Sequence, residues 1–299
     1  MITITVERGL VRLKSWEDLY ETPGFTRDLD PKTVHLKEII GVYAFDSRQP
    51  CGLKSCRQPH SNGYLVTTTA GQVTNLGSVC GKNNFSVTFT NLQKAFDRDF
   101  RAKERRERLE VLKSRLPDVI TRIDTIKARA GQFYTPIRHL GGDSGSMPRV
   151  VVDAIRGMRR SGDGAISRTR KATKQEQELA LETGNARPGT PYYLTETAGR
   201  LSGVGAISAS SALRTTFQEL EPALRKLQSQ DVESLSDKDA RHLDKVTGGL
   251  DSRIEQLQQT VDLLGTFASR ENLSQLESLI ESASDRKLFS IFLESLPSG

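Results

Sequence analysis

Cysteine, histidine and tryptophan are scarce in this sequence, with three, four and one residues among 299. An odd number of cysteines cannot form a closed disulfide framework, so we expect a reducing compartment. No run of 18 consecutive apolar residues occurs, which argues against a membrane-spanning helix. The N-terminal residues also lack the basic start and long apolar stretch of a signal peptide. Together these absences predict a cytoplasmic protein.

Aromatic residues make up only 6% of the chain and apolar residues 36%, whereas 27% are charged. This composition favours elongated helices, each burying one stripe, over a single compact globule. The net charge of +6 is uneven: residues 217–299 carry nine Lys/Arg and fifteen Asp/Glu, a balance of −6, so residues 1–216 carry +12. A basic front with an acidic tail is typical of polyanion binding, with the tail screening the front or binding a basic partner. The alternative explanation is that these charged residues only keep the helices soluble.

Residues 1–90 predict a small, β-rich α+β module. The strand-like runs are MITITV, IIGVYAF, GYLVTTT and NFSVTFT, and a short strand follows the turn in TAGQVT. Ser15 is placed to cap a helical turn in SWEDLYET.

Residues 91–130 predict a long helix with a heptad seam, typical of coiled-coil packing. Pro117 lies inside the seam and predicts a kink or a break into two helices. The seam residues are Leu109, Leu112, Leu116, Val119, Ile123, Ile126 and Ala130.

The remaining residues predict two further segments. Residues 131–205 are basic and rich in Gly and Arg, with turns and with helices expected at 148–160 and 164–183. Residues 206–299 predict an acidic helical bundle, including one helix across 243–264 and shorter helices at 270–283 and 285–296. The predicted fold class is therefore α+β, with a zinc-stabilised β-rich module followed by a mainly helical coiled-coil or bundle region.

All three cysteines and one histidine fall within residues 51–80, with the spacing C-x4-C-x3-H-x19-C. Zinc prefers four soft or borderline ligands in a tetrahedron, and Cys3His is a common structural set. We therefore predict a zinc site, for which His35 is a less favoured alternative ligand. The predicted ligands are Cys51, Cys56, His60 and Cys80.

The strand-like residues between His60 and Cys80 predict a hairpin that joins the two halves of this site. The VCGK run at 79–82 resembles the second knuckle of zinc ribbons and treble clefs, in which glycine lets backbone N–H groups point at the sulfur. The whole module is similar to small zinc ribbons and treble clefs of bacterial and phage proteins. Four protein ligands leave no open position on the metal, so the predicted site is structural.

No catalytic constellation accompanies it. GGDSGS at 141–146 is similar to a serine-protease nucleophile loop, but no histidine stands in the context that a protease requires. We therefore predict that the chain is not an enzyme.

Two segments are basic. Residues 94–115 contain nine basic and five acidic residues, many spaced three or four apart, which predicts a self-paired helix. Residues 149–174 contain eight basic and two acidic residues and lack such partners. Because arginine binds phosphate bidentately, this second segment predicts phosphate contacts. The candidates are Arg156, Arg159, Arg160, Arg168, Arg170, Lys171 and Lys174.

These features support two hypotheses. The first is a non-enzymatic, zinc-containing adaptor that binds DNA or RNA through the arginine-rich middle. The alternative is a protein-interaction or assembly subunit of a larger complex, for example of phage or mobile-element origin, that uses the coiled coil and the acidic tail. The heptad seam suits a homo-oligomer and an intramolecular bundle equally.

Overall fold

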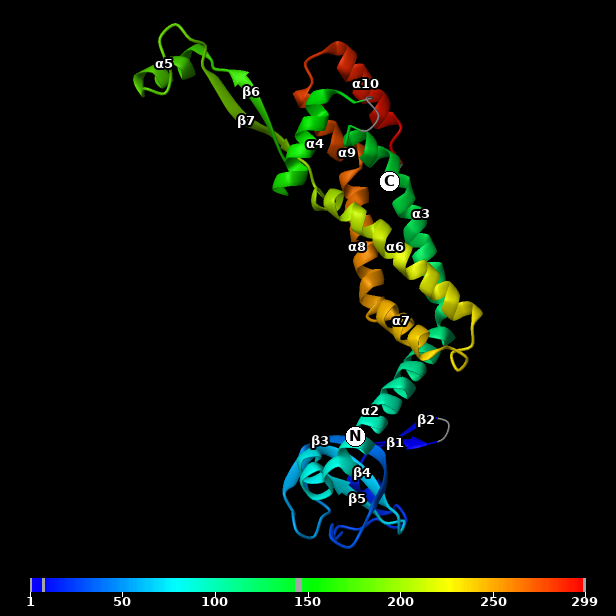
Figure 1. Ribbon diagram of the computed structural model, residues 1–299. Coiled ribbons are helices and arrows are strands. Elements are labelled where there is room, and N and C mark those ends of the chain that lie inside the picture. The colour runs from blue at the N-terminus through cyan, green and yellow to red at the C-terminus, as the bar shows by residue number, and fades with distance from the viewer. Residues whose placement is uncertain (1, 7–8, 143–146, 298–299) are drawn as a thin grey trace. The chain divides into compact units, whose positions relative to one another are not determined.

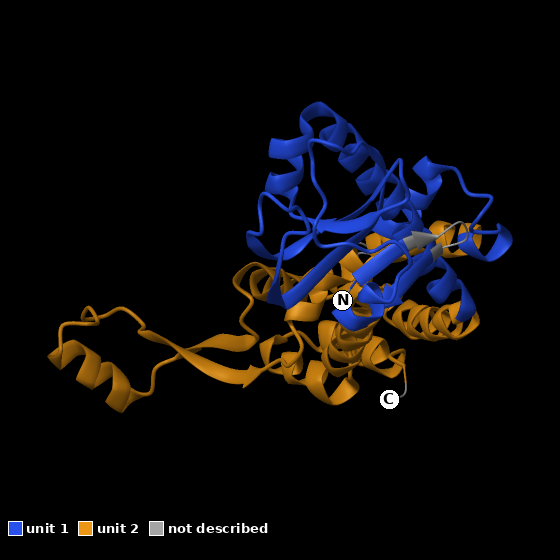
Figure 2. Ribbon diagram, turned by 90° about the horizontal axis from the view of Figure 1, so that it is seen from below, with its two compact units in different colours: residues 1–114, 227–245 blue, residues 115–226, 246–299 orange. Residues whose placement is uncertain are grey.

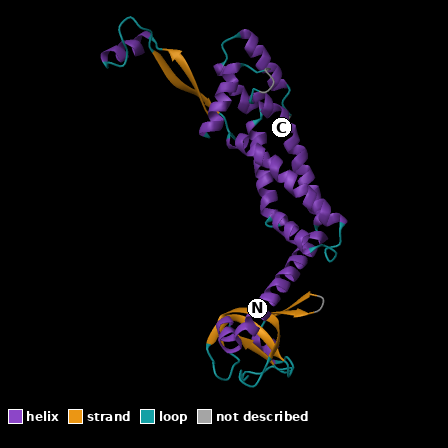
Figure 3. Cartoon of the chain, viewed as in Figure 1, coloured by secondary structure: helices purple, strands orange, loops and turns teal. Residues whose placement is uncertain are grey.

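The structure is a computed structural model that describes residues 2–6, 9–142 and 147–297. The described residues form a mixed α+β fold in which neighbouring strands pair antiparallel (Figure 3). The chain divides into two compact units, residues 1–114 with 227–245 and residues 115–226 with 246–299 (Figure 2). These boundaries differ from those of the four sequence segments, which were drawn from composition. As a division into domains, the four segments stay a prediction.

A five-stranded sheet in the order β2-β1-β3-β4-β5 lies at the centre of the first unit (Figure 1). Three predicted strands and the predicted short strand after TAGQ are confirmed. Helix α1 (Trp16–Tyr20) begins after Ser15, whose side chain accepts the N–H of Asp18 in a capping box, as predicted. The strands are β1 (Ile2–Val6), β2 (Gly9–Leu13), β3 (Leu36–Pro50), β4 (Pro59–Thr68) and β5 (Val73–Leu76).

The fourth predicted strand, NFSVTFT, is wrong, because these residues belong to helix α2 (Ser78–Ser114). Alternation of aromatic and β-branched residues suggested a strand, but the apolar positions also recur every three or four residues. That helical period continues beyond the short run and places one face on a buried cluster. The residues on this face are Phe89, Leu92, Phe96 and Phe100, and Phe85 packs on the same cluster from before a kink in α2 at Ser86, where φ is 46°.

The predicted break at Pro117 is confirmed. Helix α2 ends at Ser114, and α3 (Leu116–Leu140) begins with Pro117 in its first turn, where the missing N–H costs no hydrogen bond. All seven seam residues are buried, each at most 7% exposed. Burial of the stripe follows from its spacing, whereas coiled-coil pairing stays a prediction.

The core of the second unit is helical. Helix α3 packs along α8 (Leu250–Phe267), and α6 (Gly205–Ser229) lies beside α8. The predicted helix across 243–264 is two helices, α7 (Asp237–Thr247) and α8, because Gly249 adopts a left-handed φ of 64° between them. The chain ends in α9 (Arg270–Ser274), the 3-10 helix η1 (Gln275–Leu279) and α10 (Ala283–Glu294).

Helix α4 (Arg149–Ser161) confirms the prediction for 148–160, but a helix across 164–183 is wrong. The chain instead forms strand β6 (Ala165–Lys171), helix α5 (Lys174–Glu182) and strand β7 (Tyr193–Arg200), and β6 pairs with β7. We call residues 165–200 the arm. Strand β7, the partner of β6, comes only after a helix and a loop. No local pattern in the sequence therefore predicted that the two strands pair.

Every helix in the described ranges is too short or too polar to cross a lipid bilayer. Of the GGDSGS motif, residues 143–146 lie outside the described residues.

Candidate functional site

The three cysteines come from three adjoining parts of the first unit. Cys51 directly follows β3, Cys56 lies in the loop between β3 and β4, and Cys80 is in the first turn of α2. Strands β4 and β5 form the antiparallel hairpin that carries the chain from the loop to α2. The predicted hairpin between the two halves of the site is therefore confirmed.

The three sulfur atoms lie within 4.8 Å of one another, and the Sγ atoms of Cys56 and Cys80 are 3.2 Å apart. All three cysteines are free, and a disulfide would need a sulfur separation of about 2.05 Å. Two thiolates on a tetrahedral zinc ion, each about 2.3 Å from it, lie about 3.8 Å apart. The group thus has the dimensions of a metal-binding cluster.

The cluster is embedded in apolar surroundings. Cys51 and Cys80 are buried among Leu29, Leu53, Leu76 and other apolar side chains, whereas Cys56 is half-buried. Most of the sulfur cluster is therefore shielded from water, and Cys56 is the cysteine closest to solvent.

Two glycines of the motif are required by packing. A Cβ at Gly52 would stand 1.9 Å from Thr74 Oγ1, and one at Gly81 would stand 2.5 Å from the Phe89 ring. Gly81 lies within helix α2, so its role differs from the knuckle expected from the VCGK run. Its missing side chain admits Phe89 to the core beneath the cysteines.

Backbone donors favour a thiolate at the cluster. The N–H of Leu53 bonds to Cys51 and the N–H of Gln58 bonds to Cys56, each two residues after its cysteine. Burial raises the pKa of Cys51, and it raises the pKa of Cys80 to about 12. Burial acts on Cys56 as well, but the bonds from Gln58 and from the two neighbouring thiols outweigh it and lower the pKa of Cys56.

Cys56 is therefore the cysteine most readily deprotonated, and its two neighbours are the thiols that bond to it. A bound metal cation would take the place of those thiol protons and pair with all three sulfurs. The donor set fits soft or borderline metals such as zinc. The geometry brings three candidate ligands together, one fewer than predicted.

His60 stands outside the cluster, on β4. Its Nδ1–H donates to the carbonyl of Gln49 (3.1 Å), and its Nε2 accepts from the hydroxyl of Tyr43 (2.5 Å). Both ring nitrogens are therefore occupied, and burial lowers the pKa of the ring toward the neutral form. The arrangement does not support His60 as the fourth ligand. The alternative, His35, is exposed and is likewise outside the group.

Sequence reasoning missed Tyr43, which is fully buried and lies against the His60 ring. A Cβ at Gly63 would stand 2.5 Å from the Tyr43 hydroxyl, and one at Gly77 would stand 2.8 Å from the His60 ring. The two glycines make room for this pair, and their positions in the sequence were the available signal.

The predicted phosphate-binding residues fall on two structures. Arg156, Arg159 and Arg160 are exposed on α4, and Arg156 donates to the carbonyl of Gly141 (3.2 Å). The others lie on the arm: Arg168, Arg170 and Lys171 on β6, and Lys174 at the start of α5.

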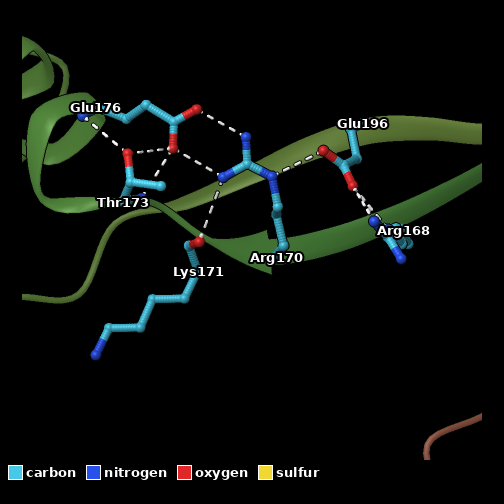
Figure 4. Close-up of polar contacts among 6 residues, drawn as sticks. All are labelled: Arg168, Arg170, Lys171, Thr173, Glu176 and Glu196. Atoms are coloured by element: carbon cyan, nitrogen blue, oxygen red, sulfur yellow. Dashed lines mark hydrogen bonds and ion pairs between the residues drawn. The ribbon is translucent and has the colours of Figure 1, made fainter.

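The expectation that residues 149–174 lack acidic partners is wrong for two arm arginines. Arg170 bonds Glu176 through both Nη atoms (2.7 and 2.8 Å) and Glu196 through Nε (2.7 Å), while Arg168 Nε bonds the other oxygen of Glu196 (2.7 Å) (Figure 4). Glu176 follows the basic segment by two residues, and Glu196 reaches it only through strand pairing. The ammonium group of Lys171 points away from this network (Figure 4).

Other basic residues of the front are also paired within the chain. Self-pairing was predicted for residues 94–115, but Arg106 and Arg108 form ion pairs with α7 instead. Similar ion pairs join residues at the start of α3 and within it to acidic residues later in the chain. The pairs are Arg106–Asp237, Arg108–Asp244, Arg115–Asp251, Lys127–Glu221 and Arg129–Asp262. Part of the positive charge of the front is thereby neutralised within each unit.

Comparison of the chain with protein-family models, curated proteins and solved structures finds no match.

The cysteine cluster predicts about one zinc per chain. Cys51→Ser should lower the metal content at least fivefold, because it removes a buried sulfur ligand. His60→Gln is the matched control and should keep the metal, since His60 bonds Tyr43 and Gln49. Elemental analysis of protein purified without chelator measures both. Loss of metal in His60→Gln would show that His60 is a ligand, and metal-free wild-type protein would refute the site.

The arm network predicts a defined pH response. Arg170, and then Thr173, lowers the pKa of Glu176 to about 2 from its usual 4.5. The stabilisation is therefore present above pH 4.5 and is lost as the pH falls toward 2. The Thr173 amide donates to Glu176 (2.8 Å), so its proton chemical shift should titrate with a midpoint near 2.

At pH 7, Glu176→Gln should speed hydrogen exchange across α5, because it removes a charged partner of Arg170. Glu178→Gln on the same helix is the control and should leave exchange unchanged. Equal effects of the two variants would contradict the network's role.

Proposed function

We propose that the chain is a non-enzymatic assembly subunit whose arm docks on a partner protein and whose N-terminal unit is held by a structural zinc ion. The arm carries this proposal, because its base is anchored to η1 and two of its arginines are paired with glutamates, yet it presents apolar side chains to solvent. A reducing compartment such as the cytoplasm suits the three free thiols.

The base of the arm is fixed to the second unit. The N–H of Leu201 donates to the carbonyl of Gly164 (2.8 Å), and the N–H of Arg200 donates to Gln275 Oε1 (3.0 Å). A Cβ at Gly199 would stand 2.8 Å from the same oxygen. The direction of the arm is therefore set by close contacts with η1.

The outer part of the arm buries little. Ala172 and Ala180 are its buried apolar residues beyond Ile166, whereas Leu179 and Tyr193 are 61% and 57% exposed. An isolated two-stranded hairpin is marginally stable in water, because it buries too little apolar surface. A partner that covers Leu179 and Tyr193 would supply that burial.

The two faces of the β6–β7 ladder differ in charge. One face holds the network of Arg168, Arg170 and Glu196. The other face is uncharged apart from Lys171 and consists of cross-strand pairs that are exposed: Ser167–Thr197, Thr169–Thr195 and Lys171–Tyr193. Tyrosine is enriched in protein interfaces, and this face lacks the arginine cluster that would favour a phosphate backbone.

Photo-crosslinking tests the arm directly. Benzoylphenylalanine in place of Leu179 or Tyr193 should give the same discrete protein adduct in cells that naturally carry the chain. The matched control is the label at Ile291, which is 56% exposed on α10 and should give none. Absence of an adduct at both arm positions, or an equal adduct at Ile291, would refute docking through the arm.

A second candidate function is nucleic-acid binding through α4. Arg159 and Arg160 are exposed and have no carboxylate partner among the described residues. With Arg156 they form a compact basic patch on one short helix, which suits sequence-independent phosphate contacts.

The triple variant Arg156→Ala/Arg159→Ala/Arg160→Ala should weaken binding of DNA or RNA oligonucleotides about tenfold at low salt and reduce the salt slope by about one per lost contact. Arg168→Ala/Arg170→Ala serves as the control, because both side chains already bind glutamates. Fluorescence anisotropy across a salt series gives both quantities. Unchanged affinity in the triple variant would remove α4 as the interface.

A further inference from the structure

We infer that the partner of the arm is a second copy of this chain, with α5 of one copy docking on α4 of the next. This inference rests on the proposed function, since it names the protein that the arm binds. Both surfaces of the contact are present on the chain, and they are complementary in charge.

The exposed face of α5 is apolar and acidic. Gln175, Glu178, Leu179 and Glu182 are exposed at helical spacing, which places them on one stripe. Leu179 is the large apolar side chain of this stripe, and the glutamates flank it. Glu176, by contrast, is held by Arg170 and is not available to a partner.

The exposed face of α4 is basic and contains a gap. Arg156 and Arg160 are exposed one turn apart, with Gly157 between them in sequence. A Cβ at Gly157 would meet nothing within 4 Å, so the helix backbone is open to a neighbour at this point. Val150, 41% exposed, extends the apolar part of the face by two turns. Asp153 is the acidic group on this face and lies 3.7 Å from Arg149 and 4.0 Å from Arg156.

Helices approach closely where one of them carries glycine, because a side chain of the other fills the space. In the inferred contact Leu179 lies over Gly157, and Glu178 and Glu182 face Arg156 and Arg160. Like the e and g charges of coiled coils, these pairs would set the orientation of the two helices more than their affinity.

The contact joins two copies rather than two parts of one. Both views show the arm extending away from the helices of its own unit (Figures 1 and 2), and its base is held by Gln275 and Gly164. Because donor and acceptor surfaces are different patches, the contact is heterologous and generates a ring or an open chain of subunits.

Sedimentation equilibrium of the metal-loaded full chain tests this contact. The wild-type protein should self-associate weakly, with a Kd on the order of 0.1 mM for so small an interface. Glu178→Arg/Glu182→Arg should weaken association at least tenfold, as should Arg156→Glu/Arg160→Glu, because each places like charges opposite one another. Glu277→Arg/Glu281→Arg is the control, since it makes the same charge change at exposed positions outside α5 and should associate as the wild type does.

The decisive measurement is made on a mixture of the two interface variants. The reversed α5 of one variant matches the reversed α4 of the other, and their unaltered α4 and α5 surfaces match as well. The mixture should therefore co-assemble with one-to-one stoichiometry, in an alternating ring or chain, although each variant alone is monomeric. A wild-type chain that is monomeric up to about 1 mM, or a mixture that stays monomeric, would overturn the inference.

The outcome separates this inference from the proposals above. Crosslinking of the arm to a different protein, together with a monomeric wild type, would keep the docking function and discard the second copy. Loss of oligonucleotide binding in Arg156→Glu/Arg160→Glu, with a monomeric wild type, would assign the α4 arginines to nucleic acid instead.

Discussion

The close approach of three cysteine sulfurs is the constraint on which the first unit depends. Cys51 ends a strand, Cys56 belongs to the next loop and Cys80 begins a helix, so the cluster ties three elements together at one point. Two of the sulfurs are buried among apolar side chains, where thiolates are costly without a cation. A metal bound at this cluster would therefore couple metal binding to folding of the unit, which matters most for a small domain with a modest core.

In the second unit, the main electrostatic feature is a cluster of arginines that glutamates neutralise. Its arm concentrates arginine on one strand, and paired glutamates from α5 and β7 neutralise that charge and lock the helix to the hairpin. Asp251 and Asp262 likewise meet Arg115 and Arg129 within this unit. Positive charge in the sequence is thus not the same as free positive charge on the surface. Among the charged surfaces that stay exposed are the basic face of α4 and, opposite in character, the acidic and apolar face of α5.

Features with a short period or a local cause were predictable. The seam from Leu109 to Ala130, the break at Pro117 and the cap at Ser15 depend on residues a few positions apart, and all three are present. The grouping of the cysteines followed from their short spacing. The NFSVTFT run failed because its alternation was weaker than the helical period of the surrounding phenylalanines. His60 lies outside the sulfur group, because spacing in sequence carries no information on which way a strand residue faces its neighbours.

The sequence by itself determined which helices bury an apolar stripe, where the long helix breaks and which three thiols can meet, because these depend on neighbours along the chain. Tertiary structure alone decided that β6 pairs with β7 and that Arg168 and Arg170 bind Glu196. It also decided that the Tyr43 hydroxyl bonds to Nε2 of the His60 ring. The side-chain contacts among these join residues 17 to 28 positions apart through a hairpin or a sheet. Such partners are set by strand register, and register is fixed only when the whole sheet or hairpin has formed.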